Sequence, residues 1–74
     1  MKKRLPLTSR QKEIWDYLLE WREDYGIGTS PTRQEIGDAI GFSKQWVDEN
    51  LQKMVEKKYI MLPRGKYRNI VILK

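Results

Sequence analysis

A short break at Gly41 divides residues 35–54, "EIGDAIGFSKQWVDENLQKM", into two segments with helical patterning. Before the break, Ile36 and Ile40 are four residues apart and therefore share one face of a helix. Gly41 is a natural helix end, and Ser43 is a natural N-cap for the helix that follows. Two helices joined by so short a turn are typical of a helix-turn-helix.

The segment after the break predicts a third helix over about residues 43–57, with one apolar side. Val47, Leu51 and Met54 recur at helical spacing, so this side is expected to face the core. Trp46 lies at the edge between the apolar and polar sides. The exposed side is predicted to carry Lys44, Gln45, Asp48, Glu49, Gln52 and Lys53.

A first helix is predicted over about residues 9–25. Thr8 and Gln11 have the spacing of a capping box, which places the helix start at residue 9. Gly26 follows the pattern as a natural end. The apolar face, on which we expect the aromatic side chains to be core, carries Ile14, Trp15, Leu18, Leu19, Trp21 and Tyr25.

The helix before the break begins with a second capping box, made by Thr32 and Glu35. Gly37 lies inside this predicted helix, where glycine costs up to ~1 kcal/mol relative to alanine. A residue this small indicates that another helix packs closely against it.

The pattern changes from helical to extended after residue 58. Residues 59–62 and 69–74 are rich in β-formers and predict two short strands. Residues 63–68, "PRGKYR", join them with turn formers and three cations. The predicted fold is therefore mostly α with a small β-hairpin, a winged helix-turn-helix of three helices plus a wing. We expect this domain to cover residues 8–74, after a flexible basic arm over residues 1–7.

Composition argues against several function classes. The chain has 74 residues with no cysteine and no histidine, so thiolate sites and imidazole chemistry are absent. No apolar run reaches the ~20 residues of a membrane span, and the basic start lacks the apolar segment of a secretory signal. Glu35 and Asp38 have no nucleophile or further acid–base partner. We expect a cytoplasmic protein that is not an enzyme, with no metal, no cofactor and no membrane partner.

Charge is unevenly distributed along the chain. Residues 1–12 carry five cations and no anion, residues 13–50 three cations and nine anions, and residues 51–74 seven cations and one anion. If the two basic ends meet in the fold, they form a positive patch that suits a polyanion. The alternative is that the charge serves solubility alone.

A nucleic-acid function would draw its affinity from cations that displace counterions from phosphates. Gln45 is a candidate for reading a base, because glutamine can pair with adenine at two atoms. Asp48 and Glu49 either accept from a cytosine amine or repel other DNA. Trp46 could contact a thymine methyl group, anchor a partner protein or cover the core edge. The candidates for contacting the DNA backbone are Arg10, Thr32, Arg33, Ser43, Lys44, Lys53, Arg64, Lys66, Tyr67 and Arg68.

Four stretches carry a family resemblance: "LTSRQKEIWDYL" at 7–18, "SPTRQEIGDAIGF" at 30–42, "LQKMVEKKYI" at 51–60 and the closing "NIVIL". Together they resemble the DNA-binding domain of the LexA repressor family. The resemblance implies binding to double-stranded DNA as a dimer, with the third helix in the major groove and the wing on the backbone or minor groove. It implies base-reading roles for Gln45, Trp46, Asp48 and Glu49.

This chain departs from the family pattern in three ways. The segment after Gly41 and Phe42 is one residue shorter, and Trp46 replaces a small residue that would lie close to DNA. We expect no counterpart of the family's self-cleaving C-terminal domain, which carries the dimer interface. The operator, the self-cleavage and the damage response therefore do not transfer with the resemblance.

Two functions are consistent with these features. The first is a small repressor-like regulator that binds specific double-stranded DNA, as a monomer or as a homodimer on a palindromic site. The second is a protein-interaction module, a small inhibitor or adaptor of bacterial or phage origin, which would use Trp46, Asp48 and Glu49. Either would act in the cytoplasm of a bacterial or phage-infected cell, and the regulator would associate with the nucleoid when bound to DNA.

Overall fold

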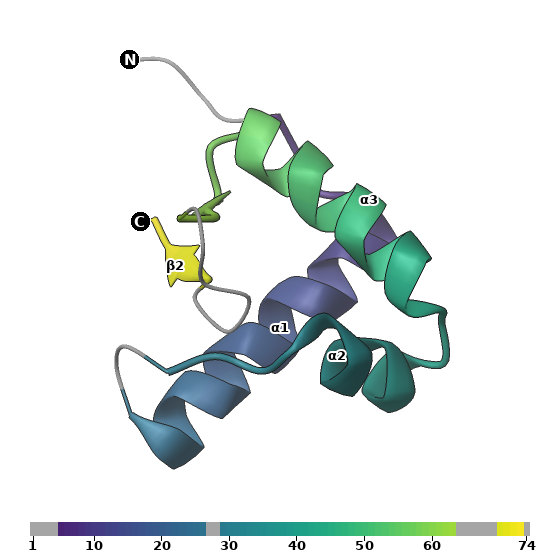
Figure 1. Cartoon of the computed structure of the whole chain (residues 1–74). Helices are drawn as coiled ribbons and strands as arrows, with labels where there is room; N and C mark the ends of the chain where they lie inside the picture. The colour runs from purple at the N-terminus through teal and green to yellow at the C-terminus, as the bar shows by residue number, and fades with distance from the viewer. Residues whose placement is uncertain (1–4, 27–28, 64–69, 74) are drawn as a thin grey trace.

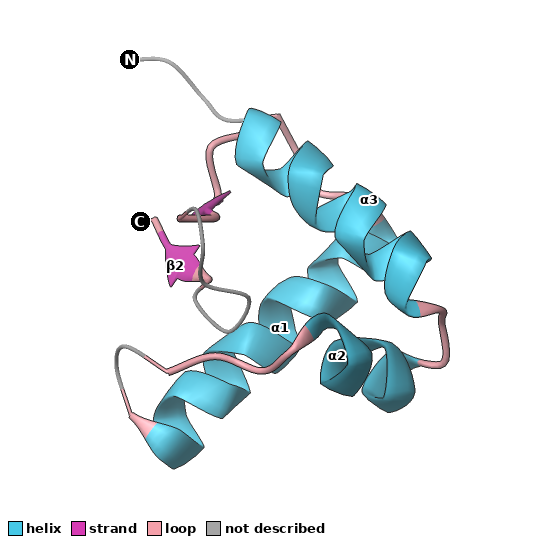
Figure 2. Ribbon diagram, viewed as in Figure 1, coloured by secondary structure: helices cyan, strands magenta, loops and turns pink. Residues whose placement is uncertain are grey.

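The computed structural model describes residues 5–26, 29–63 and 70–73. These residues form three helices followed by two strands (Figures 1 and 2): α1 (Ser9–Tyr25), α2 (Arg33–Ile40), α3 (Lys44–Glu56), β1 (Ile60–Met61) and β2 (Val71–Ile72). The strands pair in antiparallel fashion, with Ile60 opposite Ile72 and Met61 opposite Val71. The predicted winged helix-turn-helix class is confirmed, although each strand is shorter than predicted.

Side-chain caps begin the three helices at the predicted residues. The Thr8 hydroxyl accepts a hydrogen bond from the Gln11 backbone N–H, and the Gln11 side chain accepts one from the Thr8 N–H. Thr32 and Glu35 make the same reciprocal pair at the start of α2. The Ser43 hydroxyl caps α3 by accepting a backbone N–H of its first turn. Because these bonds join residues three apart, a short stretch of sequence is enough to determine each helix start.

The turn between α2 and α3 folds back over the middle of α2. Gly41 ends α2 with a φ of 85°, in the left-handed region that favours glycine. The carbonyl oxygen of Phe42 then lies 2.5 Å from the position that a Cβ on Gly37 would occupy. The small residue predicted to admit another helix instead admits the backbone of the turn.

We expect Gly37→Ala to lower the free energy of unfolding by about 1 kcal/mol. Alanine gains about 1 kcal/mol of helix propensity, but forcing its methyl group against the Phe42 carbonyl costs about 1–3 kcal/mol. Urea unfolding followed by circular dichroism measures the difference. Asp38→Ala, at an exposed position of the same helix, is the matched control and should change stability by less than about 0.5 kcal/mol. A stabilised Gly37→Ala protein would contradict the close approach.

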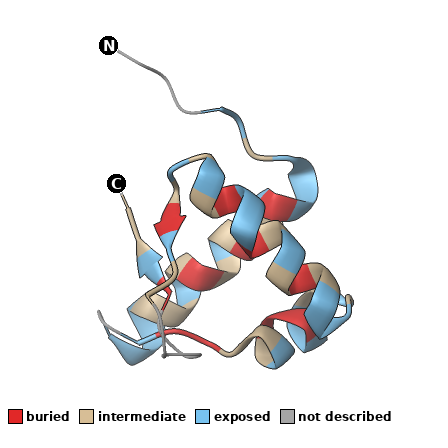
Figure 3. Ribbon diagram, turned by 45° about the horizontal axis from the view of Figure 1, so that its top comes forward, coloured by how far each residue is buried: buried red, intermediate tan, exposed pale blue. Residues whose placement is uncertain are grey.

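Apolar side chains from the three helices and the hairpin meet in one core (Figure 3). Trp15 packs at its margin, with its ring edge-on to Tyr59 and the ring centroids 5.4 Å apart. The Ser30 hydroxyl accepts a hydrogen bond from the Ile70 N–H at 2.8 Å, which ties the segment before α2 to the hairpin. The buried apolar residues are Ile14, Leu18, Ile36, Val47, Leu51, Met54, Ile60 and Ile70.

Tyr25 is an exception to the predicted core face of α1. Its side chain is 63% exposed, and Trp21 is only half-buried. The last turns of α1 extend past the neighbouring elements (Figure 1), so nothing in the described part of the chain covers them fully. The prediction that Tyr25 belongs to the core is wrong, because periodicity shows which face a residue shares and not how far its neighbours reach.

The amino-terminal segment lies against the domain from Pro6 onward. Leu7 packs against the core, and the Lys57 ammonium donates a hydrogen bond to the Pro6 carbonyl at 2.9 Å. The division into an arm over residues 1–7 and a domain over residues 8–74 stays a prediction. Among the described residues, no helix is long and apolar enough to cross a membrane.

Candidate nucleic-acid interface

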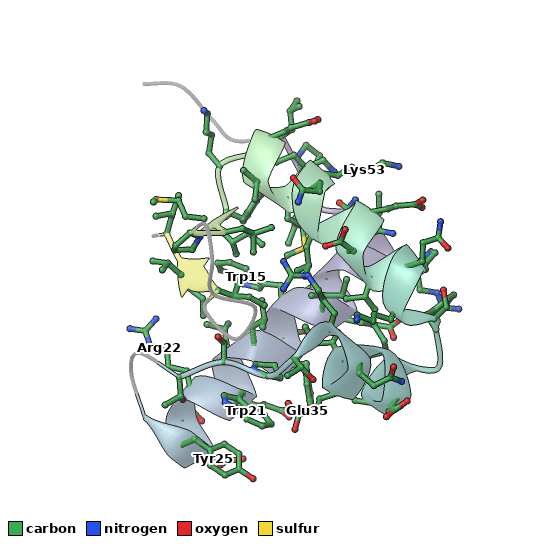
Figure 4. All side chains as sticks on the ribbon, in the orientation of Figure 1. Trp15, Trp21, Arg22, Tyr25, Glu35 and Lys53 are labelled. Carbon is green, nitrogen blue, oxygen red and sulfur yellow. The ribbon has the colours of Figure 1, made fainter. Side chains whose placement is uncertain are left out.

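The buried side of α3 determines which of its residues point outward. Val47, Leu51 and Met54 are fully buried, as their spacing predicted. Figure 4 shows Lys53 on the outer side of α3, away from α1. The exposed polar residues of the helix are Lys44, Gln45, Glu49, Gln52, Lys53 and Glu56. This helix therefore presents cations, amides and carboxylates on its accessible surface, the combination needed to contact both phosphates and base edges.

Arg33 and Asp48, which were predicted to act separately, contact each other. The Nε of Arg33, at the start of α2, lies 2.8 Å from an Asp48 carboxylate oxygen on α3. The Arg33 side chain is 17% exposed and that of Asp48 is 50% exposed. The pair joins the two helices of the helix-turn-helix. It also places a positive charge directly beside one of the two carboxylates that would face a DNA backbone.

Trp46 is built into a stack of side chains at the start of α3. Its ring lies nearly parallel to that of Phe42, with centroids 4.0 Å apart and an interplanar angle of 17°. The Arg10 guanidinium lies 5.2 Å from the centroid of the same Phe42 ring, and it also pairs with Glu13 at 2.8 Å. Trp46 packs against the core at its margin. Of its three predicted roles, covering the core edge is therefore the one with contacts in this structure.

Thr32 and Ser43, predicted as phosphate contacts, serve first as helix caps. Each hydroxyl oxygen accepts a backbone N–H three residues later in the chain. Thr32 is half-buried and Ser43 is exposed. Both remain at helix amino ends, where backbone N–H groups and the helix dipole favour an anion.

A polar network that sequence reasoning missed joins α1 to α3. Gln11 is only 2% exposed, and its Nε2 donates to Asn50 Oδ1 at 3.2 Å. The Lys57 ammonium donates to Gln11 Oε1 at 2.7 Å, in addition to its bond to Pro6. One signal was available in the sequence. Gln11 lies three and seven residues before the buried Ile14 and Leu18, which places a polar side chain on the apolar face of the helix.

The network brings the amino-terminal segment beside the carboxyl-terminal end of α3. Pro6 and Lys57 belong to the two basic ends of the chain, but the cations of residues 1–4 lie outside the described residues, so the predicted meeting of the basic segments stays a prediction. Arg64, Lys66, Tyr67 and Arg68 lie outside the described residues, and their predicted roles stay predictions. In the part of the chain that the structure describes, no group of three or more acidic side chains is placed to hold a metal ion.

A family model described as the LexA DNA binding domain matches residues 4–69. The chain belongs to this family. The LexA repressors of Alcanivorax borkumensis, Glaesserella parasuis and Actinobacillus pleuropneumoniae are 38%, 40% and 41% identical to it over 68, 72 and 68 residues. These alignments cover 90%, 96% and 90% of this chain but 32%, 34% and 31% of the relatives, so the chain spans about a third of their length.

Because the chain belongs to the LexA family, the exposed face of α3 is its candidate surface for contacting DNA. This LexA-type domain has the helix-turn-helix geometry of a DNA reader, and its α3 is the second helix of that motif. The matched family model describes a DNA-binding domain and no catalytic one. The stacking of Trp46 on Phe42 is a feature of this chain that the resemblance did not anticipate.

Proposed function

We propose that this chain is a repressor that recognises a specific sequence in double-stranded DNA, with α3 in the major groove. The observation that carries the proposal is the exposed polar face of α3 in a domain of the LexA DNA-binding family. The relatives' description as repressors supports the regulatory role. As a DNA-binding regulator, the chain would act on the nucleoid in the cytoplasm.

The exposed residues of α3 divide by the DNA chemistry they suit. Lys44 and Lys53 supply cations for phosphates, and Gln45 supplies the paired donor and acceptor that match adenine. Glu49 is the carboxylate available to accept from cytosine. Arg33 acts chiefly through Asp48, because their ion pair holds the start of α2 against α3. The wing residues would add phosphate contacts, and a homodimer would read both halves of a palindromic site.

Selection from a random duplex pool tests this function and reveals the preferred sequence. On the selected duplex, we expect Gln45→Ala to weaken binding about tenfold, because one bidentate base contact contributes about 1–3 kcal/mol of discrimination. Fluorescence anisotropy at two salt concentrations measures the change. Gln34→Ala, on the exposed surface of α2, is the matched control and should bind as the unmodified chain does. Failure of the unmodified chain to bind any duplex at low salt would refute the proposal.

The alternative, a small inhibitor or adaptor that binds a protein through Trp46, Asp48 and Glu49, has less support. Trp46 is stacked on Phe42 and Asp48 is paired with Arg33. Of the three, Glu49 is exposed, whereas Trp46 and Asp48 are half-buried. Loss of partner binding in Trp46→Ala, with duplex affinity unchanged, would favour this alternative. In both cases we propose that the chain has no catalytic activity of its own.

A further inference from the structure

A row of aromatic side chains runs along the carboxyl-terminal half of α1. Tyr17, Trp21 and Tyr25 follow one another at spacings of four, so they share one face of the helix. The rings of Tyr17 and Trp21 have centroids 6.2 Å apart, and those of Trp21 and Tyr25 are 4.4 Å apart. Tyr25 is the most exposed of the three, at 63%. Tyr17 and Trp21 are half-buried, so the row leaves aromatic surface partly open to solvent.

Carboxylates surround this aromatic row. Residues 16–25 contain four acidic residues and one cation. Asp16, Glu20 and Asp24 form a second row at spacings of four, and their side chains are exposed. Figure 4 shows Glu35 of α2 on the same side as Trp21 and Tyr25.

The pKa of Tyr17 reflects its burial and the negative charge around the aromatic row. Burial raises the pKa of its hydroxyl, and the nearby Glu35, Tyr25 and Glu20 raise that pKa further. The region, which we call the acidic aromatic patch, therefore consists of Tyr17, Glu20, Trp21, Asp24 and Tyr25 with Glu35 beside it. Such a surface repels a phosphate backbone and attracts cations.

The acidic aromatic patch lies away from the outer side of α3. The start of α1 contacts α3 through Gln11 and Asn50, whereas Tyr25 is the last residue of α1. A helix of this length spans about 25 Å. Figure 4 places Lys53 and Tyr25 toward opposite ends of the domain. DNA on α3 would therefore leave the acidic aromatic patch uncovered.

The patch also contains a hydrogen-bond donor that lacks an acceptor. The indole Nε1–H of Trp21 is buried and has no hydrogen-bond partner among the described residues. A buried donor left unpaired is unfavourable, because it has lost its hydrogen bonds to water. The exposed Tyr25 ring packs against the same indole, with the ring centroids 4.4 Å apart and the ring planes tilted by 39°.

We propose that the acidic aromatic patch is a docking surface for an arginine- or lysine-bearing segment of a second protein. Guanidinium and ammonium groups bind favourably over tryptophan and tyrosine rings and pair with carboxylates, and this surface offers both within one helix face. The proposal gives a role to the acidic residues in the second half of α1, which the proposed DNA contacts do not use. It goes beyond the proposed DNA-binding function and does not depend on it.

Nuclear magnetic resonance on the isotope-labelled full chain tests this proposal. The probes are a short arginine- and lysine-rich peptide and a matched peptide with glutamine at every cationic position. We expect the cationic peptide to shift the indole N–H resonance of Trp21, while those of Trp15 and Trp46 stay in place. The glutamine peptide should leave all three unchanged.

Two variants separate the patch from general attraction between opposite charges. Glu20→Gln combined with Tyr25→Ala should weaken peptide binding about tenfold. The matched control, Glu49→Gln combined with Met61→Ala, removes one exposed carboxylate and one exposed apolar side chain elsewhere and should bind normally. Each substitution is also made singly, so that a folded variant is available.

Equal binding by the two double variants, peptide-induced shifts centred on α3, or no shift at millimolar peptide would each overturn the proposal. If the indole N–H resonances instead shift when the protein is concentrated without peptide, the surface binds a second copy of this chain. That result would also overturn the proposal.

Discussion

Leu51→Ala is expected to lower the free energy of unfolding by about 2–5 kcal/mol, the usual cost of a leucine truncation in a core. Leu51 is fully buried in the middle of α3. A domain of this length has a total stability of about 4–11 kcal/mol, so the variant loses much of it. Urea unfolding measures the loss. Duplex binding should fall in parallel, because α3 would no longer be held at a fixed angle to α2.

Gln52→Ala is the control for this experiment. Gln52 is the next residue along α3 and is exposed, so its truncation should change stability by less than about 0.5 kcal/mol. The comparison tests the rotation of α3 about its own axis. If the two variants were equally stable, α3 would face the core differently, and the assignment of Lys44, Gln45 and Lys53 to the outer surface would be wrong.

Gln11→Ala is expected to cost about 2–3 kcal/mol of unfolding free energy. The substitution removes a nearly fully buried side chain and takes away hydrogen-bond partners of Lys57 and Asn50. Hydrogen bonds to charged groups contribute about 1.5–3 kcal/mol each. Lys57→Met should lose part of the same energy. The double variant should therefore be more stable than the sum of the two single losses predicts, because both substitutions remove the same hydrogen bond between Gln11 and Lys57.

Lys53→Met serves as the lysine control, since Lys53 is exposed on the outer side of α3 and should affect DNA affinity more than stability. Additive losses in the Gln11 and Lys57 double variant would show that the two side chains do not act together in solution. The network holds the start of α1 and the adjoining Pro6 beside α3.

The Arg33–Asp48 pair bears on why acidic residues occur on a DNA-facing helix. An isolated carboxylate near phosphates is unfavourable, but Asp48 lies 2.8 Å from a guanidinium nitrogen. A half-exposed ion pair of this kind contributes little to stability, about 1 kcal/mol or less. Its larger effect is geometric, since it joins the start of α2 to α3. Glu49 is exposed near the start of α3, and we propose that it is the carboxylate that discriminates between bases.

Local signals in the sequence predicted the helices well. Both capping boxes and the Ser43 cap lie where the pattern placed them, and α1 has the predicted limits, Ser9–Tyr25. The spacing of Val47, Leu51 and Met54 predicted the buried side of α3. The resemblance to LexA repressors predicted the family that the model match confirmed. These predictions succeeded because each depends on residues no more than a few positions apart, or on a pattern shared with relatives.

The predictions that failed or were missing concern residues far apart in the sequence. Gly37 was expected to admit a helix and instead admits the carbonyl of Phe42, because the turn folds back on α2. Tyr25 was assigned to the core and is exposed, because the neighbouring elements end before it. Predicted roles of single residues in the DNA interface stay predictions, since they depend on a partner molecule as well as on the fold.

The sequence by itself determined where helices start and stop, which side of each is apolar, and that a hairpin follows three helices. Those properties come from hydrogen bonds within one turn and from helical periodicity, and both act over short stretches of chain. Only the tertiary structure decided that Arg33 pairs with Asp48, that Gln11 joins Lys57 and Asn50, and that Trp46 stacks on Phe42. Such contacts require the helices to be placed relative to one another, which depends on how the whole core packs.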